Sequence, residues 1–213
     1  MLRYIYADDL GRFPGLAETM FRDRARQFHD RLGWEVEVNG AGFERDAYDD
    51  MNPLYVIWET AEGRHGGSMR FLPTTGDTMI NDHFLHLTDG VEIRSPFIWE
   101  CTRFCLAPGA DAQVSAALML GGMELGLRNH LSHAVGVFDA RMVRIYARLG
   151  WGPVVLGTDG TGRDAISVGL WAFEEALRPR LLERAGVTEA ISRAWLDRSF
   201  GLWPNGTAQA LTA

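Results

Sequence analysis

The sequence contains no lysine, and all 21 of its basic residues are arginine. A mechanism that forms a Schiff base on lysine, or that holds phosphates with a P-loop lysine, is therefore excluded. Cysteine is almost as scarce, because Cys101 and Cys105 are the only two. Their spacing is not a CxxC motif, and two cysteines alone cannot form a structural zinc site. We expect reduced, buried thiols that pack as small apolar residues.

Long apolar runs are also missing. No stretch approaches the roughly 18 consecutive apolar residues that a membrane-spanning helix needs. The N-terminal segment MLRYIYADDLGRF has acidic residues where a secretory signal needs its apolar run, so we expect a cytoplasmic protein. The net charge of −7 argues against nucleic-acid binding, because neutralising phosphates requires a basic surface.

What is present is the composition of a globular protein. The chain has 213 residues, of which 46% are hydrophobic and 23% charged, enough for one sizeable core. We predict a single domain over residues 1–203. Residues 204–213 lack a core pattern and are expected to form a flexible tail.

Hydrophobic periodicity and turn signals divide the chain into helices and strands. Helices are predicted at 15–32, 113–129, 141–149 and 174–185. Strands are predicted at 34–38, 54–60, 67–72, 97–106, 134–138, 154–156 and 166–172. Strands come first as hairpins and later alternate with helices. This order predicts an α/β sandwich with a mixed central sheet and helices on both faces.

Polar and aromatic residues of the first half form the most informative pattern. Each has an ordinary explanation when taken alone: a solvated helix arginine, a core tryptophan or aspartates that cap a loop. Their combined spacing carries the weight. The set is Arg24, Phe28, Trp34, Asp46, Asp49, Arg70, Phe84, Glu100 and Arg103.

Five segments around these residues have a recognisable sequence. They are MFRDRARQFHDRLGWEV from Met20, ERDAYDD from Glu44, SMRFLPTTGDTMINDHF from Ser68, IWECTRFCL from Ile98 and RIYARLGW from Arg144. Together they resemble the acyl-homoserine lactone synthases of the autoinducer synthase family, over about residues 1–170. All nine positions of the set match the residue types of that family.

The resemblance implies a fold and a reaction. The fold is that of N-acetyltransferases, a three-layer αβα sandwich whose mixed sheet splays to form a groove for an acyl thioester. The reaction transfers an acyl group from acyl-acyl carrier protein to the amine of S-adenosylmethionine. Lactonisation then releases methylthioadenosine and yields a quorum-sensing signal. S-adenosylmethionine is a substrate, so no cofactor is expected. An acyl-CoA donor is the alternative.

The chemistry assigns roles to the matched residues. An amine must lose a proton before it attacks a thioester, and Glu100 is the candidate base, with Arg103 beside it. The sulfonium of S-adenosylmethionine suits the faces of Phe28 and Trp34, with Phe84 nearby. Asp46 and Asp49 are expected near the cationic groups of that substrate. Arginines orient carboxylates through paired hydrogen bonds, and the candidates are Arg24, Arg70 and Arg103. Equally, Asp46, Asp49 and Arg70 fit an ion-pair network that shapes the site without touching substrate.

One geometric difficulty concerns Glu100 and Arg103. On a regular strand these two side chains point to opposite faces, because side chains alternate. If both serve one site, a bulge or a sharp twist must separate them.

The second half of the sequence provides the evidence on the acyl donor and the acyl chain. After Leu106 the chain reads APGADAQVSAAL, without a glycine-rich pyrophosphate loop, which favours a carrier-protein donor over CoA. Such a carrier is acidic, so the stripe Arg141, Arg144 and Arg148 is the predicted docking site. A second candidate stripe is Arg178, Arg180 and Arg184, and the plain alternative for either is a solvated helix face.

Small and flexible residues predict the acyl pocket. Family members that favour 3-oxo chains often have threonine where Gly136 aligns, so an unsubstituted chain is expected here. Gly136, Met123 and Met142 are the predicted pocket residues, with Met119 and the glycines of the 113–129 helix (Gly121, Gly122 and Gly126) as further candidates. Ordinary helix–sheet packing is the alternative for all of them.

Other functions fit less well. The pairs His83/His86 and His130/His133 lack a third ligand at a recognised spacing, so no metal site is predicted. A serine hydrolase would need a GxSxG elbow, which is absent. An N-acyltransferase acting on another amine, or a non-catalytic acyl-binding module, stays open as an alternative.

Overall fold

One seven-stranded mixed sheet forms the centre of the protein. The computed structural model describes residues 1–162 and 164–201, so the predicted tail lies outside the described residues. The strand order is β1-β2-β3-β4-β5-β7-β6, and β4–β5 is the one parallel pair in the described sheet. The strands are β1 (Leu2–Tyr6), β2 (Leu54–Glu59), β3 (His65–Pro73), β4 (Ile98–Leu106), β5 (His133–Asp139), β6 (Val154–Asp159) and β7 (Ile166–Ala172).

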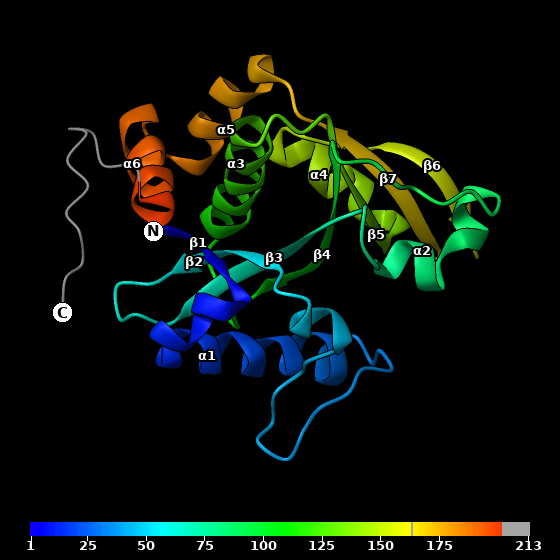
Figure 1. Ribbon diagram of the computed structural model, residues 1–213, viewed down its shortest axis with the longest axis horizontal. Helices are drawn as coiled ribbons and strands as arrows, with labels where there is room; N and C mark the ends of the chain where they lie inside the picture. Colours follow the sequence, from blue (N-terminus) through cyan, green and yellow to red (C-terminus); the bar gives the residue numbers. More distant parts are fainter. Residues whose placement is uncertain (163, 202–213) are drawn as a thin grey trace.

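Helices cover both faces of this sheet, which confirms the predicted α/β sandwich (Figure 1). The α-helices are α1 (Pro14–Ala25), α2 (Met79–His83), α3 (Ala112–Arg128), α4 (Val143–Leu149), α5 (Arg178–Ala185) and α6 (Glu189–Phe200). Short helical turns are η1 (Ala7–Arg12), η2 (Arg26–Arg31), η3 (Ala47–Asp50), η4 (Leu85–Thr88), η5 (Ala140–Met142) and η6 (Glu175–Leu177). Helix α1 packs on one face of β3 and β4, and α3 packs on the opposite face of β1 to β3.

The largest core cluster lies between the sheet and α3, and close approach there depends on glycine. A Cβ atom at Gly121 would lie 2.6 Å from Val56, and one at Gly126 would lie 2.1 Å from Phe173. The glycines of α3 therefore serve helix–sheet packing, the plainer of the two predicted roles, and do not line a pocket.

The sheet opens between β4 and β5. Residues Ile98–Glu100 pair with His133–Val135, and beyond Glu100 the two strands separate. The register of β4 against β3 then shifts between Thr102 and Cys105, and Arg103 has a φ of 54°. This is the predicted bulge, located at Arg103 itself. It directs Arg103 to the face that carries Glu100, where both border one cavity.

Several predicted elements differ from the structure. The strand predicted at 34–38 is wrong: the segment makes a single bridge, Val38 to Glu44, and most of it is exposed. Alternating residue types do not form a strand without a neighbour to pair with. The helix predicted at 15–32 ends in a π turn, in which the Leu32 N–H donates to the Gln27 carbonyl (3.1 Å). Strand β1 and helices α2 and α6 were not predicted.

Candidate active site

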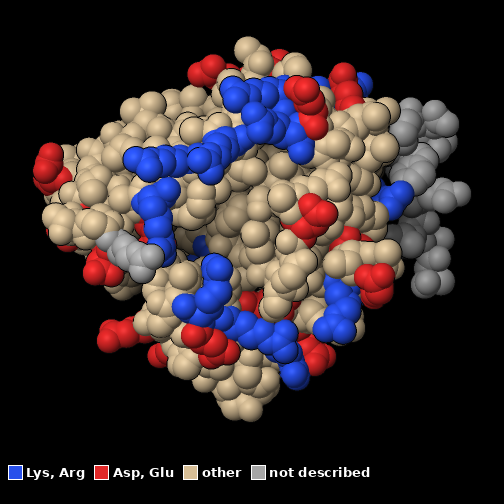
Figure 2. All heavy atoms as spheres, turned by 180° about the vertical axis from the view of Figure 1, so that it is seen from behind, with Lys and Arg blue, Asp and Glu red and all other residues tan. Residues whose placement is uncertain are grey.

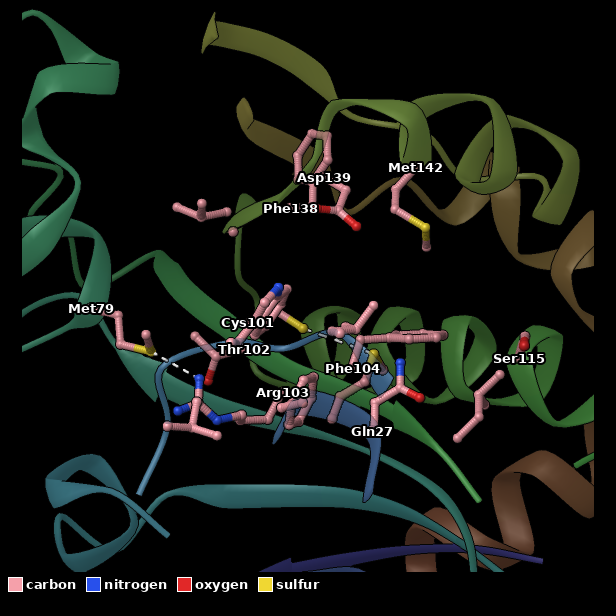
Figure 3. Close-up of a pocket in the computed structure, with 18 of the residues that line it drawn as sticks. Gln27, Met79, Cys101, Thr102, Arg103, Phe104, Ser115, Phe138, Asp139 and Met142 are labelled. Atoms are coloured by element: carbon pink, nitrogen blue, oxygen red, sulfur yellow. Dashed lines mark hydrogen bonds between the residues drawn. The ribbon is translucent and has the colours of Figure 1, made fainter. Parts of the chain in front are cut away.

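A cavity of about 1360 Å³ occupies the opening between β4 and β5. In Figure 3, Cys101, Thr102, Arg103 and Phe104 project from β4 on one side, and Phe138, Asp139 and Met142 lie opposite. Met79 stands at one end and Ser115 of α3 at the other (Figure 3). The cavity thus joins a polar end near Glu100 to an apolar end beneath α4.

Six charged side chains form a closed ring at the polar end. Arginines and carboxylates alternate around it, three of each. The contacts are Glu44–Arg24 (2.5 Å), Arg24–Asp49 (2.8 Å), Asp49–Arg70 (2.9 Å), Arg70–Asp46 (3.0 Å), Asp46–Arg103 (2.7 Å) and Arg103–Glu44 (2.9 Å).

Only two of the six ring members line the cavity. Asp46 and Arg103 line the cavity wall, whereas Arg24, Asp49 and Arg70 are each 1% exposed and lie behind it. Burial alone would raise the pKa of Asp49, but the Arg24 and Arg70 guanidiniums hold that pKa well below its usual range. Four residues of the predicted substrate-binding set, Arg24, Asp46, Asp49 and Arg70, thus form an ion-pair network, and their direct contact with substrate stays a prediction.

Glu100 is buried on the cavity wall without a guanidinium hydrogen bond. Its carboxylate accepts the backbone N–H of Met79 (3.1 Å) and of Ile80 (2.7 Å) at the start of α2. Burial raises the pKa of Glu100 to about 7, against the opposing effect of those two N–H groups and of Arg70. A carboxylate with this pKa is partly deprotonated at neutral pH, which suits a general base.

Aromatic rings adjoin the ring of charges. Phe28 and Trp34 stack with centroids 5.1 Å apart, and the Arg103 guanidinium lies 5.4 Å from the Phe28 centroid. Phe28 is buried and Trp34 is 40% exposed, and both line the cavity together with Phe84. The structure thus brings all three predicted aromatics to the polar end.

The apolar end is lined by residues from β5, β7, α3, η5 and α4, including Gly136, Met142, Tyr146 and Trp171. A Cβ atom at Gly136 would lie 2.8 Å from the Cys101 carbonyl oxygen, so the position has no room for a side chain as the strands stand. The prediction for Met123 was wrong. Met119 lines the cavity, while Met123, one helical turn later, is fully buried in the core.

The family model for autoinducer synthases matches residues 14–176, most of the chain. The chain belongs to the autoinducer synthase family. Its activity is that of an acyltransferase of the acyl-homoserine lactone synthase class. An acyl-homoserine-lactone synthase of Rhizobium etli is 40% identical over 178 residues, covering 80% of this chain and 84% of that protein. One of Agrobacterium fabrum is 33% identical over 153 residues, covering 68% and 72%.

Solved structures share the fold of the synthase. MesI, a CoA-dependent acyl-homoserine lactone synthase, matches with a TM-score of 0.79 at 22% identity, covering 90% of this chain and 98% of its own. BjaI, with S-adenosylmethionine and isopentyl-CoA, gives 0.79 at 23%, covering 92% and 99%. A chain assigned as an N-acetyltransferase from Lactobacillus plantarum gives 0.55 at 10%, covering 81% and 99%. The expected N-acetyltransferase-like fold is confirmed.

Arginines border the mouth of the cavity. The predicted docking stripe, Arg141, Arg144 and Arg148, is exposed on η5 and α4, and exposed Arg26 and Arg31 line the cavity from η2. Figure 2 shows blue side chains on both sides of a hollow in this face. Among the described residues, no carboxylate pairs with Arg31, Arg144 or Arg148.

The sequence reasoning missed Glu44 and Met79. Glu44 closes the ring, and the Met79 sulfur lies 3.5 Å from an Arg103 nitrogen and 3.6 Å from an Arg70 nitrogen. Both stand in segments that were quoted for the resemblance. However, the sequence around Glu44 is that of an exposed acidic loop. Only its contacts with Arg24 and Arg103 show that this glutamate is buried in the ring.

A buried serine, histidine and aspartate also meet, between α1 and β3. His65 Nδ1 lies 2.9 Å from Asp23, and His65 Nε2 lies 3.0 Å from the Ser68 hydroxyl. Ser68 is 1% exposed and does not line the cavity, so this chain of hydrogen bonds has no accessible nucleophile. It ties α1 to the sheet.

The remaining predictions concern cysteines, metals and membranes. Cys105 is buried as predicted, but Cys101 is only partly buried and lines the cavity, and burial raises the pKa of both thiols to about 12. Within residues 1–162 and 164–201, no group of three or more His, Cys, Asp or Glu is placed to hold a metal ion. None of the described helices has the combination of length and hydrophobicity that a membrane span requires.

Proposed function

We propose that the synthase transfers an unsubstituted acyl chain from acyl-acyl carrier protein to the amine of S-adenosylmethionine and then closes the lactone. The observation that carries this proposal is that one cavity contains a candidate base, a charged and aromatic region and an apolar region next to one another. A carboxylate with a pKa of about 7 stands beside a charged and aromatic end, which continues into an apolar end at the β4–β5 opening.

The acylation step needs two proton transfers. Glu100 removes a proton from the substrate ammonium, and the freed amine attacks the thioester carbonyl. A C–N bond forms, the C–S bond breaks, and the carrier leaves as a thiolate. That thiolate takes up the second proton, which the nitrogen loses as it becomes an amide. We assign stabilisation of the oxyanion to backbone N–H groups of β4 beyond Glu100, where β4 is no longer paired with β5.

Lactonisation needs no further base. The carboxylate oxygen of the acylated substrate attacks the γ-carbon, and the bond from that carbon to the sulfonium breaks. The sulfur keeps the electron pair and leaves as neutral methylthioadenosine. Phe28 and Trp34 stack beside Arg103, a setting that suits a sulfonium next to an aromatic face.

Within the ring, the two members that line the cavity are the ones we assign to substrate. Asp46 faces the cationic groups of S-adenosylmethionine, and Arg103 orients its carboxylate. Arg24, Asp49 and Arg70 act by holding those two, because they are buried behind the wall.

The start of α3 supports a carrier-protein donor. A helix N-terminus binds a phosphate through free N–H groups, as CoA would require. Here the Gln113 N–H donates to the Asp111 carboxylate (2.9 Å), and the Ala110 N–H donates to the Ala107 carbonyl (3.0 Å). Pro108 has no N–H to offer. The unpaired arginines at the cavity mouth suit an acidic carrier instead.

Incubation with S-adenosylmethionine and matched acyl-carrier-protein and acyl-CoA donors tests the proposal. Methylthioadenosine and lactone release are measured for straight chains and their 3-oxo analogues. The proposal predicts faster turnover with the carrier-bound, unsubstituted donors. Faster turnover with acyl-CoA, the donor named for MesI and BjaI, would assign the alternative donor. Absence of methylthioadenosine with every donor would refute the S-adenosylmethionine reaction.

A further inference from the structure

We propose that Glu44 is a positioning residue that aims Arg103 into the cavity and keeps the ring of charges neutral, so that a cationic substrate binds beside it. The inference rests on the proposed use of S-adenosylmethionine. It concerns a residue that does not line the cavity and therefore acts through its partners.

Glu44 divides its two oxygens between two arginines. Oε2 accepts from Arg24 Nε at 2.5 Å, and Oε1 accepts from Arg103 Nε at 2.9 Å. The residue is 0% exposed. Its backbone N–H donates to the Phe21 carbonyl at 3.1 Å, which fixes the loop against α1. Glu44 thus contacts α1 through its main chain and its side chain, and the bulge of β4 through its side chain.

The bulge gives this link its importance. Arg103 has a φ of 54°, a left-handed conformation that is costly for a residue with a side chain. Its guanidinium is held at Nε by Glu44 and at Nη2 by Asp46 (2.7 Å). With Glu44 absent, one of these two anchors is lost, and the guanidinium is free to turn away from the cavity.

Charge balance gives Glu44 a second role. Three arginines and three carboxylates cancel within the ring. Loss of the Glu44 charge leaves one net positive charge buried behind the wall, where the Coulomb interaction is weakly screened. The sulfonium of S-adenosylmethionine must bind beside that wall and is repelled.

The variant Glu44→Gln separates this role from plain packing. A glutamine oxygen can accept from one arginine, but its NH2 group faces the N–H of the other. The matched control is Glu124→Gln on α3. Glu124 is 6% exposed, accepts from Arg178 (3.0 Å) and Ser192 (2.6 Å), and lies away from the cavity.

Three quantities are measured for the wild type and both variants: KM for S-adenosylmethionine, kcat, and the inhibition constant of S-adenosylhomocysteine, whose sulfur is uncharged. We expect Glu44→Gln to raise KM for S-adenosylmethionine by about tenfold and to weaken S-adenosylhomocysteine much less. Glu124→Gln is expected to change neither quantity, although both variants lose stability.

Equal weakening of the charged and uncharged ligands, or the same pattern in Glu124→Gln, would overturn the inference. If Glu44→Gln does not fold, Glu44→Asp keeps the charge and shortens the reach. It should lower kcat while leaving the discrimination between the two ligands intact, and a lost discrimination would count against the charge role. A wild type that does not turn over S-adenosylmethionine would instead refute the proposed function.

Discussion

Glu100 and Asp49 are equally buried carboxylates near Arg70, yet their pKa values move in opposite directions. Asp49 receives two guanidinium hydrogen bonds from Arg24, at 2.9 and 2.8 Å, and an ion pair from Arg70. Glu100 receives only backbone N–H groups. Full opposing charges in contact overcome the cost of burial, whereas two peptide dipoles do not.

This difference divides the polar end into two functions. The ring of charges fixes geometry, because each member is held by ion pairs to both of its neighbours. Glu100 is held in place by backbone groups that leave its proton affinity high. The cavity wall therefore combines a rigid ionic frame with one group able to exchange a proton.

The largest expected effect is on activity at Glu100. Replacing Glu100 by Gln removes the base and should lower kcat by at least about 100-fold. The thermal midpoint should fall much less than the activity, because the acceptor lost at one of the two N–H groups is offset by removal of a buried group that resists ionisation. Lactone formation and thermal unfolding are measured on the same preparation. Unchanged turnover would remove the base role and leave the rest of the site intact.

Breaking the ring should instead reduce stability. Arg24→Met leaves Asp49 and Glu44 without their shared cation, and removal of one partner of a buried pair costs about 3–5 kcal/mol. Denaturant unfolding measures this loss. The control is Arg22→Met, whose side chain is 50% exposed in its pair with Glu18 and should change stability by less than about 0.5 kcal/mol. Similar losses in both variants would mean that the ring adds no special stability.

The two carboxylates should also make the free energy of unfolding depend on pH with opposite slopes. The pKa of Glu100 rises from 4.5 to about 7 on folding, so between these values the folded state binds more protons and stability falls as pH rises. The lowered pKa of Asp49 gives stability that is lost as pH falls below its unfolded value. Thermal midpoints of wild type minus Glu100→Gln between pH 4.5 and 7.5 should show the first slope. A flat difference would contradict the raised pKa.

A smaller effect is expected at the apolar end. Gly136→Ala places a Cβ 2.8 Å from the Cys101 carbonyl oxygen, so β4 and β5 must shift apart by some tenths of an ångström. We expect kcat/KM to fall by roughly threefold to tenfold, and more for long acyl chains than for short ones. An equal loss for all chain lengths would place Gly136 in packing alone.

The sequence predicted those parts of the fold that depend on local pattern. The strand of Ile98–Leu106 and the helix of Ala112–Arg128 have long, consistent apolar patterns, and both were found within a residue or two. Residues 34–38 alternate between apolar and charged side chains, but they have no neighbouring strand to pair with. The sequence of one segment does not show whether a pairing partner exists. Helix α6 has weak amphipathic character and is defined by its packing on β1.

The candidate site was predicted as a set of residues, but not as an arrangement. The bulge at Arg103 followed from strand geometry, because Glu100 and Arg103 had to share a face. The closed ring did not follow, since its six members come from α1, the loop before η3, η3 itself and two strands, which are far apart in sequence. Met119 and Met123 lie four residues apart on one helix face, so helical spacing alone does not tell which of them borders the cavity and which lies in the core.

The pH dependence of kcat/KM tests the central claim most directly, that Glu100 is the proton acceptor held beside a fixed ring of charges. The profile is recorded with saturating acyl donor for the wild type and for Glu100→Gln. The account predicts a wild-type limb that rises through a pKa of about 7 and is absent or displaced in the variant. An identical limb in both proteins would assign the titration to the substrate amine and contradict the role of Glu100.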